Sequence, residues 1–253
     1  YVDLMPRPAG APLGAVMYVE YFGQTLQEVE ARLRLLRERL PGQPMEQYTD
    51  ARRMADAWRL RKAGEPLLHG VPGVRKPLGF VEDTAVDPSK LPGFIKDFKA
   101  ILASHGTQAS FYAHASVGCL HIRPMLALQE PADRATMLRI GEEVTDLVVR
   151  YGGALSGEHG SGRSRTALQL RYFGEPICRA LAATKALWDP RGIMNPGIKV
   201  RYGDEAMSVE HLRIEPDGRP LHIDGIRTFF DYEDEGGFGH AVELCNGAGL
   251  CRR

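Results

Sequence analysis

The strongest constraint on the fold is a pair of β-branched and aromatic runs, residues 108–114 and 119–127, that only four residues separate. A connection this short joins antiparallel neighbours, because a parallel crossover needs a dozen or more residues. With Val117-Gly118 as the turn, His114 lies directly opposite His121, and the two side chains share one face of the hairpin. Val-Gly is not a favoured two-residue turn, so a four-residue loop with a looser register stays open.

Helical periodicity surrounds this hairpin. Asp87-Pro88 begins a helix with apolar residues on one face, and another helix is predicted from residue 131 onward. Before them, the pattern predicts a strand at 14–22, a helix capped by Thr25, a strand at 45–49, a helix from 50 to about 62 and a strand at 79–82. Strand–helix–strand units with antiparallel partners predict an α+β fold whose helices layer on one face of the sheet.

The charge balance narrows the class of partner. The chain has 32 Lys and Arg against 32 Asp and Glu, which argues against a protein that binds nucleic acid or an anionic membrane. No apolar run approaches the ~20 residues of a membrane span. Four cysteines without a leader peptide predict a reducing, cytoplasmic location. The composition changes near residue 200, so we predict one domain over 1–200 and an extension over 201–253.

Two opposed histidines suit a single metal ion, since neutral imidazole is a common metal ligand. The Gly-rich segment Ser156–Gly162 adds Glu158 and His159 in a loop that a ligand can approach closely. The sequence permits Glu158 as a third ligand beside His114 and His121, and leaves His159 as a general base. Adjacent residues of an extended segment point to opposite sides, so Glu158 and His159 need separate roles. Histidines bonded to the backbone, and an ordinary turn, are the alternatives.

Arg123 is the cation best placed to bind a substrate. It follows His121 by two residues in one strand, so both side chains face the same way. A guanidinium beside a metal suits bidentate binding of a carboxylate. The other cations, in Arg59–Lys62 and Arg75-Lys76, are expected to be mostly solvated, and Asp189–Gly197 reads as a helix stop followed by a turn.

Five segments over residues 13–200 together resemble the C-terminal half of the FAD-linked oxidases related to D-lactate, glycolate and D-2-hydroxyglutarate dehydrogenases. The matching segments are Trp58-Arg-Leu-Arg61, Phe80-Val-Glu-Asp-Thr84, the hairpin from His114 to His121, Glu158-His159-Gly160, and Asp189-Pro190 with Asn195-Pro196-Gly197. The resemblance implies a ferredoxin-like antiparallel sheet with helices packed on one face. It also implies that most FAD contacts lie in a domain outside this sequence. Val117, Cys119 and Arg123 depart from the Asp, Asn and Asn of the relatives' hairpins.

The reaction that the resemblance implies is the oxidation of a D-2-hydroxy acid to the 2-oxo acid, with hydride passing to FAD. Arg61, Lys76 and Arg123 would bind the substrate carboxylate. His159 would accept the proton of the hydroxyl group, a form of help typically worth ~10²–10⁴ in rate.

The same resemblance implies a divalent metal, with zinc as the first choice, on His114, His121 and Glu158. Asn195 would lie near the flavin. A flavin oxidase without metal is an alternative, in which the histidines only cradle the isoalloxazine. His114 and Glu158 are therefore also predicted cofactor contacts, together with Asn195.

The tail resembles the entrance to a ferredoxin-type iron–sulfur region, from Gly236-Gly237-Phe238 to Cys245 and Cys251. A four-thiolate 4Fe-4S cluster needs ligands beyond Arg253, so a complete cluster is expected only in a longer protein. That protein would pass electrons to a quinone or a carrier protein, and a homodimer is a further expectation. The chain begins without Met, and both ends predict a piece of a larger protein.

Two other functions stay open from the sequence. A metal-dependent hydrolase would use the same His/His/Glu set to activate water and would need no flavin. A non-catalytic module would only support a flavin domain, and it would bind no metal.

Overall fold

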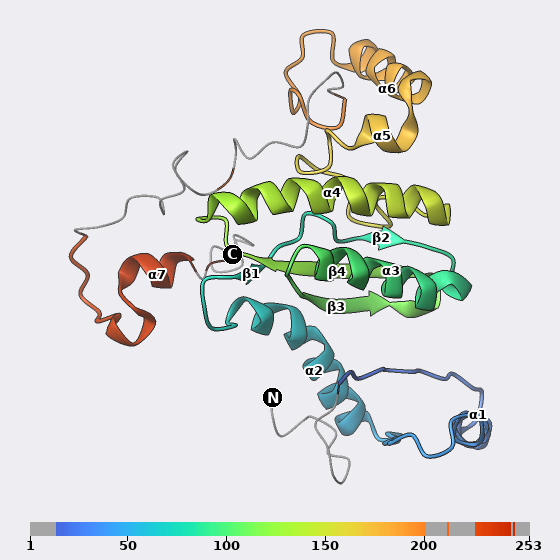
Figure 1. Ribbon diagram of the computed structural model, residues 1–253. Helices are drawn as coiled ribbons and strands as arrows, with labels where there is room; N and C mark the ends of the chain where they lie inside the picture. The colour runs from blue at the N-terminus through green and yellow to red at the C-terminus, as the bar shows by residue number, and fades with distance from the viewer. Residues whose placement is uncertain (1–13, 201–211, 213–225, 244, 246–253) are drawn as a thin grey trace. The chain divides into compact units, whose positions relative to one another are not determined.

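The computed structural model describes residues 14–200, 212, 226–243 and 245 (Figure 1). The chain divides into two compact units, Tyr1–Leu67 and Leu68–Arg253, and helix α2 (Ala51–His69) crosses the boundary. The domain boundary near residue 200 stays a prediction, because most residues beyond it lie outside the described part.

In the first unit, helix α1 (Leu26–Arg39) begins where the capping pattern predicts. Thr25 Oγ1 accepts a hydrogen bond from the Glu28 N–H at 3.3 Å, and the Glu28 carboxylate accepts one from the Gln24 N–H at 2.8 Å. Helix α2 is longer than the predicted helix that ends near residue 62. The helix continues through Gly64 and Pro66 to His69.

The predicted strands at 14–22 and 45–49 are wrong, since neither segment pairs with a strand in the described residues. Strand propensity needs a partner to become a sheet. Residues 14–22 are instead held by side chains: Trp58 Nε1 donates to Glu20 Oε1 at 2.9 Å, and the Tyr18 and Trp58 rings lie 6.5 Å apart.

The second unit contains an antiparallel sheet with β4 (Cys119–Leu126) at its centre. Strand β3 (Ala109–His114) pairs along one edge of β4, while β1 (Lys76–Pro77) and β2 (Thr84–Ala85) pair with opposite ends of the other edge. The predicted strand at 79–82 is therefore wrong, because this segment connects β1 and β2 without being a strand. Leu78 and Asp83 still donate backbone hydrogen bonds to β4, at 2.9 and 2.7 Å.

The hairpin between β3 and β4 has a four-residue connection, so the directly opposed histidines of the two-residue turn are wrong. A 3-10 turn, η3 (Ala115–Val117), is followed by Gly118 with a left-handed φ of 71°. His114 pairs with Cys119, and His121 pairs with Tyr112. The register is shifted by two residues, and because side chains alternate with a period of two, both histidines keep the same face of the sheet.

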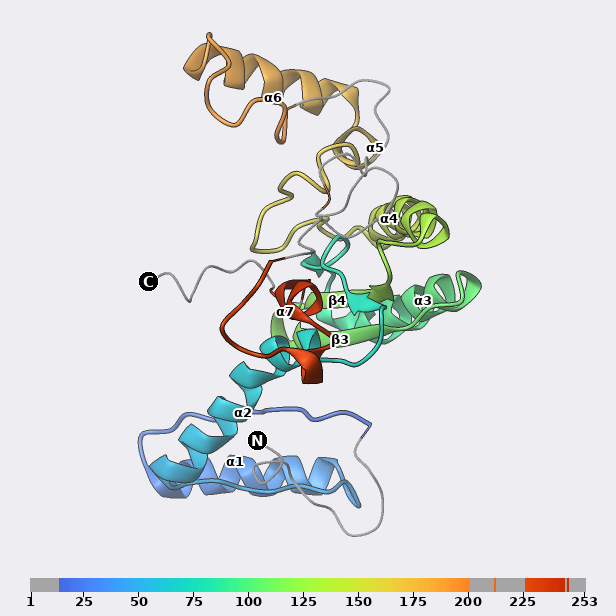
Figure 2. The same ribbon diagram turned by 90° about the vertical axis from the view of Figure 1, so that its left-hand side faces the viewer.

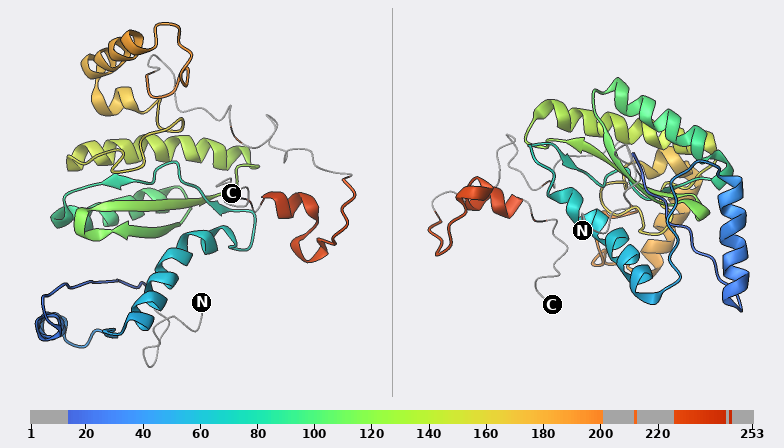
Figure 3. Two further views of the ribbon diagram at one scale, coloured as in Figure 1. Left: turned by 180° about the vertical axis from the view of Figure 1, so that it is seen from behind. Right: turned by 90° about the horizontal axis from the view of Figure 1, so that it is seen from below.

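Two helices cover the other face of the sheet (Figures 2 and 3). Helix α3 (Leu91–Ser104) follows the 3-10 turn η2 (Pro88–Lys90), which Asp87 caps as predicted, and helix α4 (Pro131–Tyr151) follows β4. Alternate β4 residues pack with the apolar stripes of both helices; this core includes Leu120, Ile122, Leu126, Phe94, Phe98, Ile140, Val144, Leu147 and Val148. The predicted α+β fold, an antiparallel sheet with helices on one face, is confirmed.

Helix α4 ends at Gly152, whose φ of 64° is the left-handed conformation that a glycine C-cap adopts. A long loop then leads to α5 (Gln169–Phe173) and α6 (Glu175–Trp188). The described part of the tail forms the 3-10 turn η4 (Glu233–Glu235) and α7 (Phe238–Glu243). Among the described helices, none combines the length and apolar character required to cross a membrane.

Candidate active site

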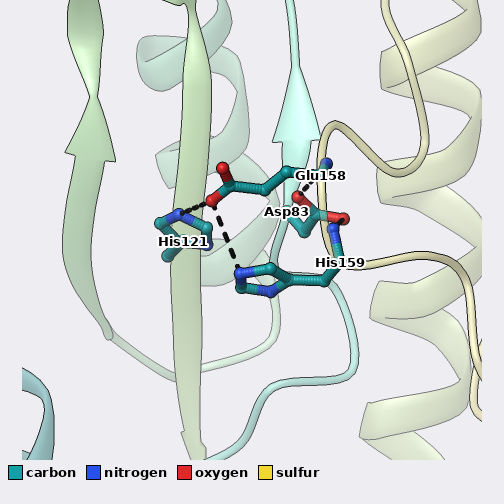
Figure 4. A group of neighbouring side chains, drawn as sticks. All are labelled: Asp83, His121, Glu158 and His159. Carbon is teal, nitrogen blue, oxygen red and sulfur yellow. Dashed lines mark hydrogen bonds and ion pairs between the residues drawn. The ribbon is translucent and has the colours of Figure 1, made fainter.

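The loop after α4 brings Glu158 to the histidines of the hairpin. One carboxylate oxygen, Glu158 Oε1, lies 3.1 Å from His121 Nε2, 3.4 Å from His159 Nε2 and 3.6 Å from His114 Nε2. The His121 and His159 rings stack with centroids 4.8 Å apart, and the His114 and His121 rings meet edge-on at 5.4 Å. Three imidazole nitrogens therefore surround one carboxylate oxygen, and Figure 4 shows Glu158 and His159 turned toward His121.

This convergence differs from the expectation for the loop in one respect. An extended segment would send the Glu158 and His159 side chains to opposite sides. In the structure the loop backbone is not extended at this point, and the two side chains meet. The sheet contributes its exposed face: His114 and His121 lie diagonally across β3 and β4, on the side that α3 and α4 leave uncovered.

Glu82 links the cation of this face to the proposed base. Arg123 Nε lies 2.9 Å from Glu82 Oε2, and His159 Nδ1 lies 3.5 Å from Glu82 Oε1. A carboxylate beside one ring nitrogen stabilises the charged imidazolium and orients the ring. Its partner nitrogen, His159 Nε2, faces Glu158. Glu82 lies in the segment Phe80–Thr84 that carries the family resemblance, but the sequence pattern predicts no role for it.

Asp83 is the second residue that sequence reasoning missed. It is fully buried, and its carboxylate accepts hydrogen bonds from Ser156 Oγ (2.5 Å), the Glu158 N–H (2.8 Å) and the His159 N–H (3.0 Å). Burial raises the pKa of Asp83, but these hydrogen bonds outweigh it, so the pKa is lowered overall. The one signal in the sequence that could have indicated Asp83 is the pair of adjacent acidic residues, Glu82 and Asp83, inside an otherwise apolar stretch.

His121 is the most enclosed of the three histidines. Its side chain is only 7% exposed, against 47% for both His114 and His159. Burial lowers the pKa of His121, and repulsion from His159 lowers it further, which favours the neutral imidazole. Among the described residues, the buried His121 Nδ1 has no hydrogen-bond partner, whereas a purely structural buried histidine would be expected to have one.

The donor set fits a divalent ion such as zinc. Two ligand atoms on one tetrahedral zinc ion lie about 3.3 Å apart, since each bond is ~2.0–2.1 Å. The Nε2 to Oε1 distances of 3.1 to 3.6 Å bracket this value. A compact group of possible ligand atoms, all within 4.8 Å of one another, combines Asp83, His121, Glu158 and His159. His114 is not a member of this group, although its Nε2 lies 3.6 Å from Glu158 Oε1. Hydrogen bonds from the loop occupy the Asp83 carboxylate, so two candidate ligand sets remain: the predicted His114, His121 and Glu158, and His121, Glu158 and His159.

The other two predicted substrate cations are Lys76, in the second unit, and Arg61, in the first. Lys76 is paired opposite Leu126, a core residue of the helix-covered face, and its Nζ donates to the Val71 carbonyl at 2.7 Å. Arg61 belongs to the first unit, on α2, where burial lowers its pKa. Asn195 follows α6 and is exposed, with a left-handed φ of 45°. The structure thus brings Arg123 to the histidines, whereas it gives Lys76 another local partner.

One further cation approaches the loop. Lys199 has a left-handed φ of 65°, and its N–H donates to Thr166 Oγ1 at 3.0 Å. Its Nζ lies so near Gly160 that a Cβ added to this glycine would be 2.9 Å away. Of the two cysteines in the segment that resembles an iron–sulfur entrance, Cys245 is exposed, and Cys251 lies outside the described residues.

The chain is similar in sequence to known proteins. The family described as FAD linked oxidases, C-terminal domain, matches residues 5–198. A D-2-hydroxyglutarate dehydrogenase of Escherichia coli (strain K12) is 39% identical over 192 residues, which are 76% of this chain and 18% of the relative. That of Pseudomonas putida is 33% identical over 259 residues, 98% of this chain and 25% of the relative. The glycolate oxidase subunit GlcD of E. coli K12 is 28% identical over 140 residues, 55% of this chain and 27% of the relative. The chain spans about a fifth to a quarter of the length of these relatives.

Proposed function

Because the chain belongs to the FAD linked oxidases and matches their C-terminal domain, we propose that it forms the substrate half of a flavin-dependent dehydrogenase. The reaction is the oxidation of a D-2-hydroxy acid to the 2-oxo acid. Relatives that are 33 and 39% identical are named D-2-hydroxyglutarate dehydrogenase, so D-2-hydroxyglutarate is the first substrate to test, before D-lactate and glycolate.

The observation that carries the proposal is the contact of three imidazoles with Glu158 beside the Glu82–Arg123 pair. An acid–base reaction on a hydroxy acid needs a proton acceptor and a cation for the carboxylate, and this face of the sheet offers both. In our proposal His114, His121 and Glu158 hold a divalent metal, zinc by the chemistry of its donors. When bound, the metal would supply polarisation of a hydroxyl oxygen, and FAD would supply the acceptor for hydride.

The protein's own residues then have separate tasks. His159 accepts the hydroxyl proton at Nε2, while Glu82 faces Nδ1 and stabilises the resulting imidazolium. Arg123 binds the substrate carboxylate, and Arg61 remains a proposal for the same carboxylate, whereas Lys76 is paired opposite Leu126 on the helix-covered side of the sheet. Asn195 is proposed to contact the flavin.

The electron route is the part of the proposal that depends on the tail. We propose that electrons leave the flavin through an iron–sulfur domain in the full-length protein, and pass to a quinone or a carrier protein. From the sequence we also propose that the full-length protein is cytoplasmic and forms a homodimer.

Anaerobic flavin reduction tests the reaction directly. The full-length protein is mixed with D-2-hydroxyglutarate, and the loss of the oxidised flavin absorbance is followed in the wild type and in His159→Gln. Loss of the base should slow reduction by ~10²–10⁴. His105→Gln is the matched control: His105 is also paired with a carboxylate, Glu143 at 2.8 Å, but lies at the end of α3.

Two results would overturn the proposal. One is a wild-type flavin that stays oxidised with D-2-hydroxyglutarate, D-lactate and glycolate; turnover of an ester or amide without flavin would then favour the hydrolase. The other is an unchanged reduction rate in His159→Gln, which would remove His159 from the reaction.

A further inference from the structure

We propose that Asp83, paired with Arg165, is a positioning residue that turns Glu158 and His159 toward His121. This inference rests on the proposed function, because it concerns the same two side chains. Neither Asp83 nor Arg165 touches the cluster of imidazole nitrogens through a hydrogen bond among the described residues. Arg165 acts through backbone carbonyl groups of the loop, and Asp83 acts through its backbone N–H groups and Ser156 Oγ.

Asp83 binds the N–H groups of the loop. Its two carboxylate oxygens accept hydrogen bonds from the N–H groups of Glu158 and His159, and one of these oxygens also accepts a hydrogen bond from Ser156 Oγ. Its backbone carbonyl accepts the Gly157 N–H at 2.6 Å. Four consecutive residues, 156 to 159, are therefore bonded to this one residue.

Arg165 binds the carbonyl groups at both ends of the same loop. Its Nη1 donates to the Leu155 carbonyl at 3.0 Å, its Nη2 to the Gly160 carbonyl at 2.7 Å, and its Nε to the Ser161 carbonyl at 3.2 Å. Nη1 also donates to the Glu82 carbonyl at 2.5 Å, next to Asp83. Arg165 Nη2 lies 3.8 Å from Asp83 Oδ2, so each charge has its opposite nearby.

The direction of the side chains follows from these bonds. Two successive N–H groups that point at one anion form a concave backbone, whereas an extended strand alternates its N–H groups. Because Glu158 and His159 are the two residues with these N–H groups, their side chains leave the loop together and meet at 3.4 Å. The carboxylate thus selects the backbone conformation that sequence alternation did not predict.

The local cost indicates that this arrangement is specified. Asp83 is 0% and Arg165 4% exposed, and a buried charge is costly unless it is paired and hydrogen-bonded. Asp83 also has a left-handed φ of 67°, a conformation of a non-glycine residue that persists only where its surroundings determine it.

The variant that tests this inference is Asp83→Asn in the full-length protein. Asn tolerates a left-handed φ, so the change removes the charge and one acceptor oxygen while sparing the backbone. Asp133→Asn is the matched control. Asp133 is likewise buried, accepts the Ala127 N–H at 2.8 Å and pairs with Arg75 at 3.0 Å, at the start of α4.

Three quantities are measured in both variants: kcat for D-2-hydroxyglutarate, affinity for Zn²⁺ by competition with a chromogenic chelator, and amide hydrogen exchange of a peptide over 155–161. In Asp83→Asn, kcat and zinc affinity should each fall 10–100-fold, as is typical when the support of a metal ligand is lost. Exchange of the loop should become faster. Asp133→Asn should leave all three at the wild-type values even where its unfolding temperature falls.

Wild-type kcat, zinc affinity and loop exchange in Asp83→Asn would overturn the inference. If that variant does not fold, Ser156→Ala decides, since it removes only the 2.5 Å hydrogen bond to Asp83; it should shift loop exchange and kcat in the same direction, and no shift would overturn the inference. Glu158→Gln separates the two proposals. If Glu158→Gln keeps the wild-type kcat and zinc content, the proposed function fails, whereas the exchange of the loop still reports on Asp83.

Discussion

Arg123 and Glu82 form an ion pair on the face of the sheet that carries the histidines, with Nε and Oε2 2.9 Å apart. Both side chains are largely enclosed, at 15 and 17% exposed, so the pair is screened less than one on the open surface. The guanidinium is therefore held by Glu82 before any substrate arrives. A substrate carboxylate has to share Arg123 with Glu82.

Removal of this cation should weaken substrate binding more than it slows the chemical step. In Arg123→Gln, the KM for D-2-hydroxyglutarate should rise about 10–100-fold, as expected from the loss of a charged hydrogen bond worth about 1.5–3 kcal/mol. Steady-state kinetics provide the measurement. Arg150→Gln is the control, because Arg150 forms an exposed pair with Asp97 on the helix side. An unchanged KM in Arg123→Gln would assign the carboxylate to another cation.

Elemental analysis of histidine variants decides the metal ligands. We expect His114→Ala and His121→Ala to lose zinc from the purified full-length protein, while His159→Ala retains zinc and loses flavin reduction. Distance alone does not separate His114 from His159, because their Nε2 atoms lie 3.6 and 3.4 Å from Glu158 Oε1. The opposite pattern, zinc retained in His114→Ala and lost in His159→Ala, would make His159 a ligand and remove it as the base.

The hairpin connection should depend on Gly118. A Cβ there would lie 1.7 Å from the Val86 carbonyl oxygen, so Gly118→Ala forces backbone to move in addition to the left-handed φ. Gly106→Ala is the control: its φ is 63° and no atom lies within 4 Å of the added Cβ. Urea unfolding should show a loss of about 1–2 kcal/mol for Gly106→Ala. The loss for Gly118→Ala should be larger by about 1–3 kcal/mol, and equal losses would contradict the close contact.

The loop after α6 should loosen in acid. Lys185 and the N–H groups of Ile193 and Met194 bond to the Asp189 carboxylate and lower its pKa, against the effect of burial. A lowered folded-state pKa stabilises the fold above the unfolded value of about 4, and this contribution is lost as the pH falls through the folded-state pKa.

Hydrogen exchange of a peptide over 189–197 measures this effect. At pH 6–7, Asp189→Asn should exchange faster than the wild type, and the ratio of the two rates should approach one as the pH falls below about 4. Taking the ratio removes the intrinsic pH dependence of exchange. A ratio that stays constant over this range would show that the Asp189 charge does not hold the loop.

Local patterns predicted the helices and the face of the hairpin, because both depend on residues near one another in sequence. Thr25 and Asp87 cap their helices as their patterns predict, and a period of two is enough to place His114 and His121 on one side. The strand at 14–22 failed for the opposite reason. A strand is decided by its partner, and this segment contacts Trp58 of a helix instead.

The site was predictable as a set of side chains but not as a geometry. Glu158 and the three histidines follow from their motifs, whereas the meeting of Glu158 and His159 depends on Asp83, which lies about 75 positions earlier in the chain. Glu82 and Asp83 are ordinary acidic residues in the sequence. Only the folded chain shows that one faces His159 and Arg123 while the other is buried under the loop.

The shifted register of the hairpin sets a parity rule for natural variation. The connection of η3 and Gly118 differs by two residues from a two-residue turn, and both versions keep His114 and His121 on one face. A homologue that gains or loses one residue on one strand between the histidines would send one imidazole into the apolar core. Insertions and deletions in this hairpin should therefore accumulate in pairs, or be accompanied by a β-bulge that restores the phase.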